Sequence, residues 1–426
     1  AIAPRSSGKA STMKFTPRSG RATTVLALLA LVLALPASFA SGQAQAQPRF
    51  SARYFPETGK VITGRFLDYW TANGGLAQQG FPISYEMTEV SDTDGKPYKV
   101  QYFERAVFEW HPEKQPPYDV LLSLLGAFSY AQKYPSGAPG QAPNTANAVT
   151  FPETGKTLGG RFRQYWERNG GLAQQGFPIS DEFNEVSALD GKTYRVQYFE
   201  RAVFEYHPEN RPPHDVLLSQ LGTFRYRAKY PLGAPLAQGV PQASPGCASH
   251  VTPGTWRGPL TVQLTAGSGG MTLVGNIAGT LESQVACDST FKASLTVSTY
   301  AAEGRAGIAR LLTCSAVEQP IADLNGVVTP MADGLHLVVL GGTWRQGATR
   351  CSGAVLASPQ TQVLTGTPLD PADIKVDRIS GDSMSGTAAF AAVPVERFMR
   401  EQTESIRPGT PLTVTTTSRW EMTRVR

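Results

Sequence analysis

The sequence predicts a multidomain protein in which two tandem α+β repeat units are followed by an all-β domain, a barrel or a sandwich, with two disulfides. Three observations lead to this prediction. A long stretch of sequence occurs twice, the composition beyond residue 246 shifts to Thr, Val, Gly and Ser, and all four cysteines lie beyond that point. A chain of 426 residues has room for two or three domains.

The duplication defines the two repeat units. Phe55–Tyr134 aligns without gaps with Phe151–Tyr230, and 57 of the 80 positions are identical. We call these segments the first copy and the second copy. The predicted order is a signal peptide (1–46), repeat unit 1 (47–134), a linker (135–149), repeat unit 2 (150–230), a linker (231–246) and the all-β domain (247–426). Both linkers are predicted from their Pro, Gly and Ala content.

Each copy is predicted to begin with a helix. In the first copy, Phe66, Tyr69 and Trp70 follow the i, i+3, i+4 spacing of a helical apolar stripe. Asn73-Gly74-Gly75 supplies residues that tolerate left-handed backbone and would end this helix. The turn "QGFPIS" comes next, with its φ angle at Pro82 set by the proline ring.

Strands and a second helix are predicted for the rest of each copy. Residues 85–91 and 98–110 are expected to form two strands joined by a hairpin at Asp94-Gly95. Along the second strand, Tyr102, Ala106, Phe108 and Trp110 would share one face. Asp119 is predicted to cap a short helix over 120–126.

Beyond residue 247, short alternating runs predict roughly eight to ten antiparallel strands. One segment, Val393–Ile406, has helical spacing instead. Cys247 and Cys287 lie almost equally far from a predicted hairpin turn at Ala266–Gly270, which favours the pairs Cys247–Cys287 and Cys314–Cys351. Zinc is the alternative for these cysteines, but the chain has no Cys-x-x-Cys spacing, so no metal is predicted.

The N-terminal residues have the layout of an export signal. Basic residues precede the apolar run Val25–Leu35, and small residues follow it, with cleavage expected after Ala40 or Ala46. An uncleaved anchor is the alternative, although eleven apolar residues are too few to span a bilayer. Without the five basic residues of 1–46, 34 basic residues balance 34 acidic ones, which argues against a nucleic-acid partner. The mature chain is expected to be exported, to lie outside the cell or in its envelope, and to have no membrane span.

The segment "GGLAQQGFPISDEF" (Gly170–Phe183) resembles the LGFP repeat of bacterial envelope proteins. The order of Pro-x-Thr-Gly, a helix with Trp, the Gly-Phe-Pro turn, Asp-Gly and an aromatic strand also fits. The sequence departs from that pattern at Gln79 and Gln175, which stand in place of the Leu. The resemblance implies a non-catalytic module that binds cell-wall polysaccharide. It also explains "FPETGK" (Phe55–Lys60) as a turn within each copy and not as a sortase signal, which would lie near the C-terminus.

Aromatic residues of the two copies are the first candidates for ligand binding, because the flat face of a sugar ring stacks on an aromatic ring. Core packing is the default for most of them, and we expect one or two exposed rings in each unit. The candidates are Tyr69, Trp70, Tyr102, Trp110, Tyr165, Trp166, Tyr198 and Tyr206.

A polar cluster on the predicted aromatic strand forms a second group of candidates: Glu104, Arg105, Glu200 and Arg201, with Glu109, His111, Glu205 and His207 beside them. These side chains suit hydrogen bonds to a sugar or an acid–base pair. Bracing of the strand against the neighbouring helix is several times more common for such clusters. His207, His214 and Asp215 suggest a metal site, but the first copy has Tyr118 in place of His214.

No catalytic residue is predicted. The chain contains no Gly-x-Ser-x-Gly, His-Glu-x-x-His or Walker sequence, and "STFK" (Ser289–Lys292) lacks the motifs that accompany it in penicillin-recognising enzymes. The expected function is therefore non-catalytic binding of cell-wall polysaccharide or another surface glycan, without a cofactor. Two alternatives stay open. One is a secreted hydrolase with its site in the C-terminal β domain, and the other is a calycin-like carrier of a small apolar ligand, suggested by Gly254-Thr255-Trp256.

Overall fold

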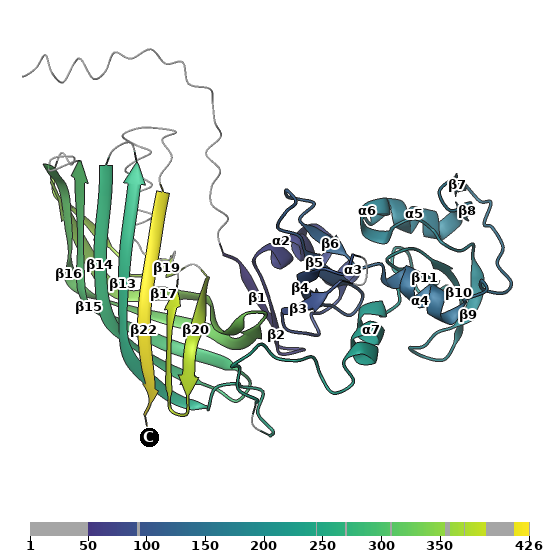
Figure 1. The fold of residues 1–426 in the computed structure, drawn as a ribbon. Coiled ribbons are helices and arrows are strands. Elements are labelled where there is room, and N and C mark those ends of the chain that lie inside the picture. The colour runs from purple at the N-terminus through teal and green to yellow at the C-terminus, as the bar shows by residue number, and fades with distance from the viewer. Residues whose placement is uncertain are drawn as a thin grey trace, which may run out of the picture. The chain divides into compact units, whose positions relative to one another are not determined.

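The computed structural model describes residues 50–91, 94–243, 245–268, 271–306, 309–353, 358–369, 371–388 and 413–425 (Figure 1). The predicted signal peptide and the predicted helix at Val393–Ile406 lie outside these residues. No helix among the described residues is long and apolar enough to cross a membrane.

A hairpin of β1 (Ala52–Phe55) and β2 (Lys60–Thr63) lies at the start of the first copy, and its first strand begins just before that copy. The segment "FPETGK" forms its turn, in which the Gly59 N–H donates to the Phe55 carbonyl at 2.8 Å. Gly59 has a φ of 65°, a left-handed conformation that glycine adopts without strain. The turn prediction for this segment is therefore confirmed.

Two helices and a four-stranded sheet follow. The helices are α2 (Gly64–Ala72) and α3 (Gly75–Gln79). The sheet has the order β3-β4-β5-β6, with β3 (Met87–Val90), β4 (Pro97–Tyr102), β5 (Val107–Trp110) and β6 (Val120–Leu122). The copy ends with α4 (Leu125–Lys133). The first helix was predicted correctly from its apolar spacing, since Phe66 and Trp70 are buried.

Two predictions for this segment were wrong. Residues 98–110 do not form one strand, because the Phe103 N–H donates to the Ala106 carbonyl at 2.8 Å and turns the chain back. Residues 120–126 do not form a helix capped by Asp119. Val120–Leu122 pairs with β5 instead, and the Asp119 carboxylate accepts from the Arg65 guanidinium at 2.6 and 2.7 Å.

The second copy has the same series of elements. Its hairpin is β7 (Val149–Phe151) and β8 (Lys156–Leu158), followed by α5 (Gly160–Arg168) and α6 (Gly171–Gln175). Its sheet has the order β12-β11-β10-β9, and α7 (Leu221–Lys229) ends it. The strands are β9 (Phe183–Val186), β10 (Thr193–Tyr198), β11 (Val203–Tyr206) and β12 (Val216–Leu218).

The two copies exchange their last helices. The Ala127 N–H of α4 donates to Glu200 O of the second copy at 2.9 Å, and the Thr223 N–H of α7 donates to Glu104 O of the first at 3.0 Å. A buried cluster combines residues of both copies, with Leu125 beside the second sheet and Leu221 beside the first. Each sheet therefore buries one face under a helix that the other copy supplies.

The segment between the copies also contacts the second copy. Ala138 is buried, and the Ala142 N–H donates to Glu182 O at 2.8 Å. The Asn144 amide donates to the Glu182 carboxylate at 2.7 Å. These bonds place part of the stretch predicted as a linker against the sheet that contains β9.

The C-terminal region forms one large antiparallel sheet. Eight of its strands pair in a closed ring, β13-β14-β15-β16-β17-β20-β21-β22, because β16 pairs with β17 and β22 pairs with β13. The choice between barrel and sandwich is thus resolved as a barrel. Its longest strands are β13 (Gly254–Ser268), β14 (Met271–Val285), β15 (Thr290–Ala306), β16 (Ala309–Met331) and β17 (Gly334–Ser352).

The remaining strands are shorter. They are β18 (Gln360–Val363), β19 (Pro368–Leu369), β20 (Ala372–Ser380), β21 (Ser383–Ala388) and β22 (Thr413–Arg424), and β18 and β19 both pair with β17. Long arrows for β13, β14, β15, β16 and β22 stand side by side in Figure 1.

Apolar side chains from all eight ring strands pack into one buried cluster. Trp256 is fully buried in it, and its indole N–H donates to Thr252 O at 3.0 Å. The carrier hypothesis requires an enclosed apolar cavity inside this cluster. Both favoured cysteine pairs are present, Cys247–Cys287 and Cys314–Cys351, and the second joins residues that face each other on β16 and β17.

Candidate functional site

Three of the eight predicted aromatic candidates, Trp70, Tyr102 and Tyr198, are buried, and the other five are half-buried. Tyr102 and Tyr198 are each 2% exposed, and their rings contact Tyr226 and Tyr130 of the exchanged helices, with centroids 5.3 and 5.1 Å apart. Trp70 is 5% exposed and donates its indole N–H to Gly80 O at 3.1 Å. Trp166 makes the corresponding bond to Gly176 O at 3.0 Å. Tyr102, Tyr198 and Trp70 therefore pack in the interior, Trp166 is half-buried, and the two tryptophans bond to the turns at Gly80 and Gly176.

Tyr69 and Tyr165 lie at the contact between the copies. The Gln174 amide donates to the Tyr69 hydroxyl at 2.8 Å, and the Gln78 amide donates to the Tyr165 hydroxyl at the same distance. Burial raises the pKa of both tyrosines. Trp110 and Tyr206 lie at the ends of β5 and β11, and both are half-buried.

The polar candidates lie in a turn and not on a strand. Glu104 Oε2 accepts from the Phe81 N–H at 3.1 Å, and the Arg105 guanidinium donates to Leu76 O at 3.1 Å. Glu200 and Arg201 make the same bonds to Phe177 N–H and Leu172 O, at 3.1 and 3.2 Å. These side chains brace the Gly-Phe-Pro turn and the short helix before it, whereas the prediction was that they brace a strand against the neighbouring helix.

The three residues suggested as metal ligands do not form one site, because two of them contact other side chains. His207 contacts the carboxylate of Glu209 at 2.9 Å, while Asp215 accepts from Arg161 at 2.6 and 2.7 Å. His214 is exposed. The described residues contain no group of three or more His, Cys, Asp or Glu that would suit a metal ion.

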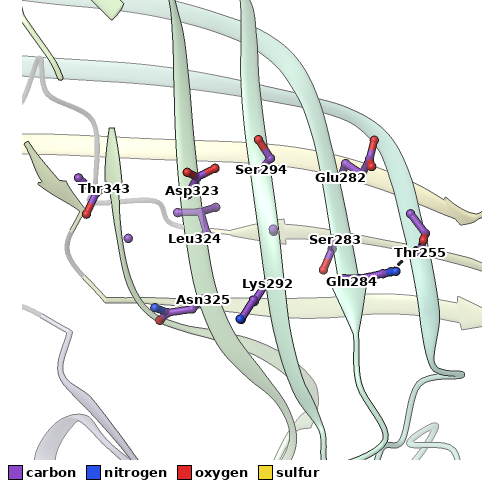
Figure 2. A pocket seen from close by; sticks show the side chains of 12 residues that line it. Thr255, Glu282, Ser283, Gln284, Lys292, Ser294, Asp323, Leu324, Asn325 and Thr343 are labelled. Carbon is purple, nitrogen blue, oxygen red and sulfur yellow. Dashed lines mark hydrogen bonds between the residues drawn. The ribbon is translucent and has the colours of Figure 1, made fainter. Parts of the chain in front are cut away.

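A groove lined by many polar side chains lies on the outer face of the closed sheet and has a volume of about 720 Å³ (Figure 2). Strand alternation produces it, because Trp256, Leu281 and Leu324 point inward and their neighbours point outward. We call this site the outer groove. Its polar lining residues are Thr255, Glu282, Gln284, Lys292, Ser294, Asp323, Asn325 and Thr343.

The strand register arranges these residues in two rows. In one row, Glu282 faces Ser294, which faces Asp323. In the other row, Gln284 faces Lys292, which faces Asn325. Figure 2 shows both rows running across β14, β15 and β16. Thr343 on β17 extends the first row and Thr255 on β13 extends the second, so that each row covers four strands and the two together cover five, about 19 Å at the usual strand spacing.

Charges of both signs occur in the outer groove. The Arg257 guanidinium lies 3.1 Å from the Glu282 carboxylate, and Arg345 lies 3.7 Å from Asp323. The Thr255 hydroxyl donates to the Gln284 amide oxygen at 2.8 Å. The side chains of Lys292 and Asn325 form no hydrogen bond or ion pair with another described residue, so their polar ends are available to a ligand.

A second hollow of about 840 Å³ continues from the outer groove. The two share Glu282 and Ser294, and the second hollow adds Thr280, Thr296 and Thr423. Donors and acceptors thus continue across β22, β13, β14 and β15. A surface with many neutral hydroxyl and amide groups suits a polar, uncharged ligand better than a strongly charged one.

No residue of the outer groove was predicted from the sequence as a ligand-binding candidate. These side chains lie in ordinary alternating strand patterns, such as "LESQV" (281–285) and "FKAS" (291–294). Alternation predicts which residues point outward, but only the pairing register shows that Glu282, Ser294 and Asp323 form one row.

Comparisons with known proteins add little at this point. No protein-family model matches the chain, and no curated protein matches it. A solved structure described as "Structure of DynF from the Dynemicin Biosynthesis Pathway of Micromonospora chersina" is 11% identical and has a TM-score of 0.21. The match covers 46% of this chain and 94% of that chain. A likeness at this level carries no argument about function. The class that the structure defines is a mostly-β protein with several small sheets, one large antiparallel sheet and two disulfides.

Proposed function

We propose that this chain is an exported, non-catalytic protein that binds a glycan of the cell envelope or another surface glycan, and that the outer groove holds the ligand. The observation that carries the proposal is the pair of polar rows across five strands. A sugar chain offers repeated hydroxyl groups, each a donor and an acceptor, and the rows offer matching carboxylates, amides and hydroxyls at regular spacing. Sequence features support the location, namely the export-type N-terminus and the resemblance of both copies to LGFP repeats.

The two copies have a different role in this proposal from the one that the sequence suggested. Repeat units with separate sites would raise avidity through a high effective concentration. Here the copies share one buried cluster and exchange helices, so they act as one body, on which Trp110 and Tyr206 are half-buried rings. These two positions remain candidates for additional contacts with the glycan.

The test measures binding of the mature chain to purified cell-wall fractions and insoluble polysaccharides in a pull-down assay. The double substitution Lys292→Ala with Asn325→Ala removes the two unpaired polar ends of the outer groove, and we expect at least tenfold weaker binding. Lys96→Ala is the matched control, because it removes one exposed positive charge far along the sequence from the groove. The double substitution Trp110→Ala with Tyr206→Ala tests whether the two copies contribute to glycan binding.

If the Lys292→Ala, Asn325→Ala protein binds as tightly as the parent protein, the glycan does not bind in the outer groove. If only the Trp110→Ala, Tyr206→Ala protein binds more weakly, the glycan site lies on the two copies. A melting curve of each variant separates loss of binding from loss of folding.

Hydrolysis is the second candidate function, and one observation favours it. Glu282 and Asp323 lie in the same row, two strands apart, and a pair of carboxylates is what glycoside hydrolysis requires. We expect no release of reducing sugar from any polysaccharide that the protein binds. Release that is abolished by both Glu282→Gln and Asp323→Asn would instead establish the hydrolase.

A further inference from the structure

Lys60 and Lys156 occupy matching positions in the two copies but have different neighbours. The Lys156 ammonium lies 3.2 Å from the Asp181 carboxylate and donates to the Gln141 side-chain oxygen at 3.2 Å. In the first copy, Tyr85 takes the place of Asp181. The Lys60 ammonium lies 3.7 Å from the centroid of the Tyr85 ring, and no other described residue forms a hydrogen bond or ion pair with it.

The nearby acidic residue does not replace the missing partner. Glu86 follows Tyr85 in the chain, but its carboxylate accepts from the Thr63 hydroxyl at 2.5 Å. Its second oxygen lies 3.1 Å from the Lys99 ammonium. Glu86 is therefore already paired, and Lys60 is left with an aromatic face as its contact.

Lys60 also lines a cavity of about 320 Å³. Tyr85, Met87, Tyr226 and the 233–237 segment form other parts of its wall. The Tyr226 hydroxyl accepts from the Ala234 N–H at 3.3 Å, and the Tyr85 ring meets the His250 ring edge-on at 5.8 Å. The amine therefore opens into a small, mostly apolar space whose aromatic rings are held in place.

Burial lowers the pKa of Lys60 to about 8. At pH 7.5, roughly a quarter of such amines are neutral, against about one in a thousand for a lysine of ordinary pKa. The neutral amine is the form that attacks a carbonyl carbon.

We propose that Lys60 is a reactive amine that condenses with a small aldehyde whose apolar or aromatic body enters the 320 Å³ cavity. The lysine nitrogen attacks the carbonyl carbon, a carbon–nitrogen double bond forms, and the carbonyl oxygen leaves as water. No oxidant or reductant takes part in this step. The inference is independent of glycan binding in the outer groove.

The experiment treats the full mature chain with benzaldehyde at pH 7.5, reduces the imine with cyanoborohydride, and compares labelling of each lysine by peptide mass spectrometry. We expect Lys60 to be labelled at least tenfold faster than Lys156. If exposure alone governed the reaction, Lys96 and Lys192, whose side chains are both 72% exposed, would react first. That order, or equal labelling of Lys60 and Lys156, would overturn the proposal.

Two substitutions make the test specific. Tyr85→Asp gives Lys60 the partner that Lys156 has, and we expect its labelling to fall to the rate of Lys156. Lys60→Arg removes the labelled peptide while it keeps the positive charge over the ring. If Tyr85→Asp failed to fold, the ratio of the labelling rates of Lys60 and Lys156 in the unchanged protein would still decide the question. If Tyr85→Asp folds and Lys60 is labelled as fast as before, that result would count against the proposal.

Discussion

Tyr85 and Asp181 show how one residue changes the chemistry of its neighbour. The two copies are alike around these positions, yet Lys156 has an ion pair and Lys60 has an aromatic ring. Removing a lysine from water costs free energy unless a negative charge compensates, so the amine without a partner releases its proton more easily. A single substitution between the copies thus converts a salt bridge into a candidate reactive group.

His336 is a residue whose charge stabilises the fold. It is 5% exposed, its Nδ1 lies 2.7 Å from Asp373, and its Nε2 lies 3.0 Å from Asp333. Asp333 also accepts from Lys375 at 2.9 Å. Burial opposes a charge on the imidazole, but the two carboxylates outweigh it, and the pKa of His336 is raised above 6.5.

The pH dependence of stability should report this histidine. Because its folded pKa is raised, its stabilising effect is fully present below pH 6.5 and is lost as pH rises through the folded pKa. His336→Gln should lower the free energy of unfolding by on the order of 2 kcal/mol at pH 5.5 and by less at pH 9. Urea denaturation at both pH values measures the difference. The exposed His214→Gln serves as control, and an equal loss at both pH values would contradict the assignment.

At the scale of elements, the two short helices α3 and α6 meet through four glutamines. The Gln79 amide donates to Gln174 Oε1 at 3.0 Å, and the Gln175 amide donates to Gln78 Oε1 at 3.0 Å. Gln79 also donates to Asn73 O at 2.9 Å. The Gln residues that depart from the LGFP pattern are therefore members of a buried hydrogen-bond network between the copies.

Restoring the Leu of that pattern should destabilise the protein. Gln79→Leu with Gln175→Leu leaves buried acceptors without donors, at a cost of about 1–3 kcal/mol for each unsatisfied group. We expect a lower melting temperature although the replacement is more hydrophobic. Gln132→Leu on the exposed side of α4 is the control and should change little. A double variant as stable as the parent protein would show that the network contributes nothing.

The exchanged helices approach the opposite sheet closely, and glycine permits this approach. A Cβ atom on Gly126 would lie 1.9 Å from Phe199 O, and one on Gly222 would lie 1.9 Å from Phe103 O. A side chain at either position would push the helix away from the backbone carbonyl that it meets.

Gly126→Ala should therefore lower the free energy of unfolding by more than about 2 kcal/mol, in spite of the better helix propensity of alanine. Chemical denaturation measures the change. Gln132→Ala in the same helix improves helix propensity without a clash, so it should be neutral or stabilising. A stabilising effect of Gly126→Ala would mean that α4 does not dock against Phe199.

At the scale of the whole molecule, the two copies depend on each other for a complete core. Each sheet is covered by the last helix of the other copy, and the aromatic pairs Tyr130–Tyr198 and Tyr102–Tyr226 join the two. A single copy would leave the apolar face of its sheet in water, which is unfavourable by about 25 cal/mol for each Å² exposed.

This mutual dependence predicts how fragments behave. Residues 50–243 should fold and remain monomeric, whereas residues 50–134 alone should be unfolded or should form dimers in which two copies exchange α4. Circular dichroism and size-exclusion chromatography distinguish these states. A stable, folded monomer of residues 50–134 would disprove the exchange of helices.

Local features were predictable because short-range physics decides them. The apolar spacing of Phe66 and Trp70 determined α2, the Pro-Glu-Thr-Gly segment determined a turn, and alternation determined the strands beyond Cys247. Predictions failed where a distant partner decided the outcome. Asp119 suggested the cap of a helix over 120–126, but pairing with β5 makes Val120–Leu122 a strand.

The sequence by itself determined the duplication, the change to an all-β region, the even number of cysteines and the turn at "FPETGK". Only the tertiary structure decided that Tyr102 and Tyr198 are core residues, that the copies exchange helices, and that Glu282, Ser294 and Asp323 stand in one row. The reason is the range of the interactions. Turns and periodicity depend on neighbours in the chain, whereas burial and register depend on residues that lie far away along it.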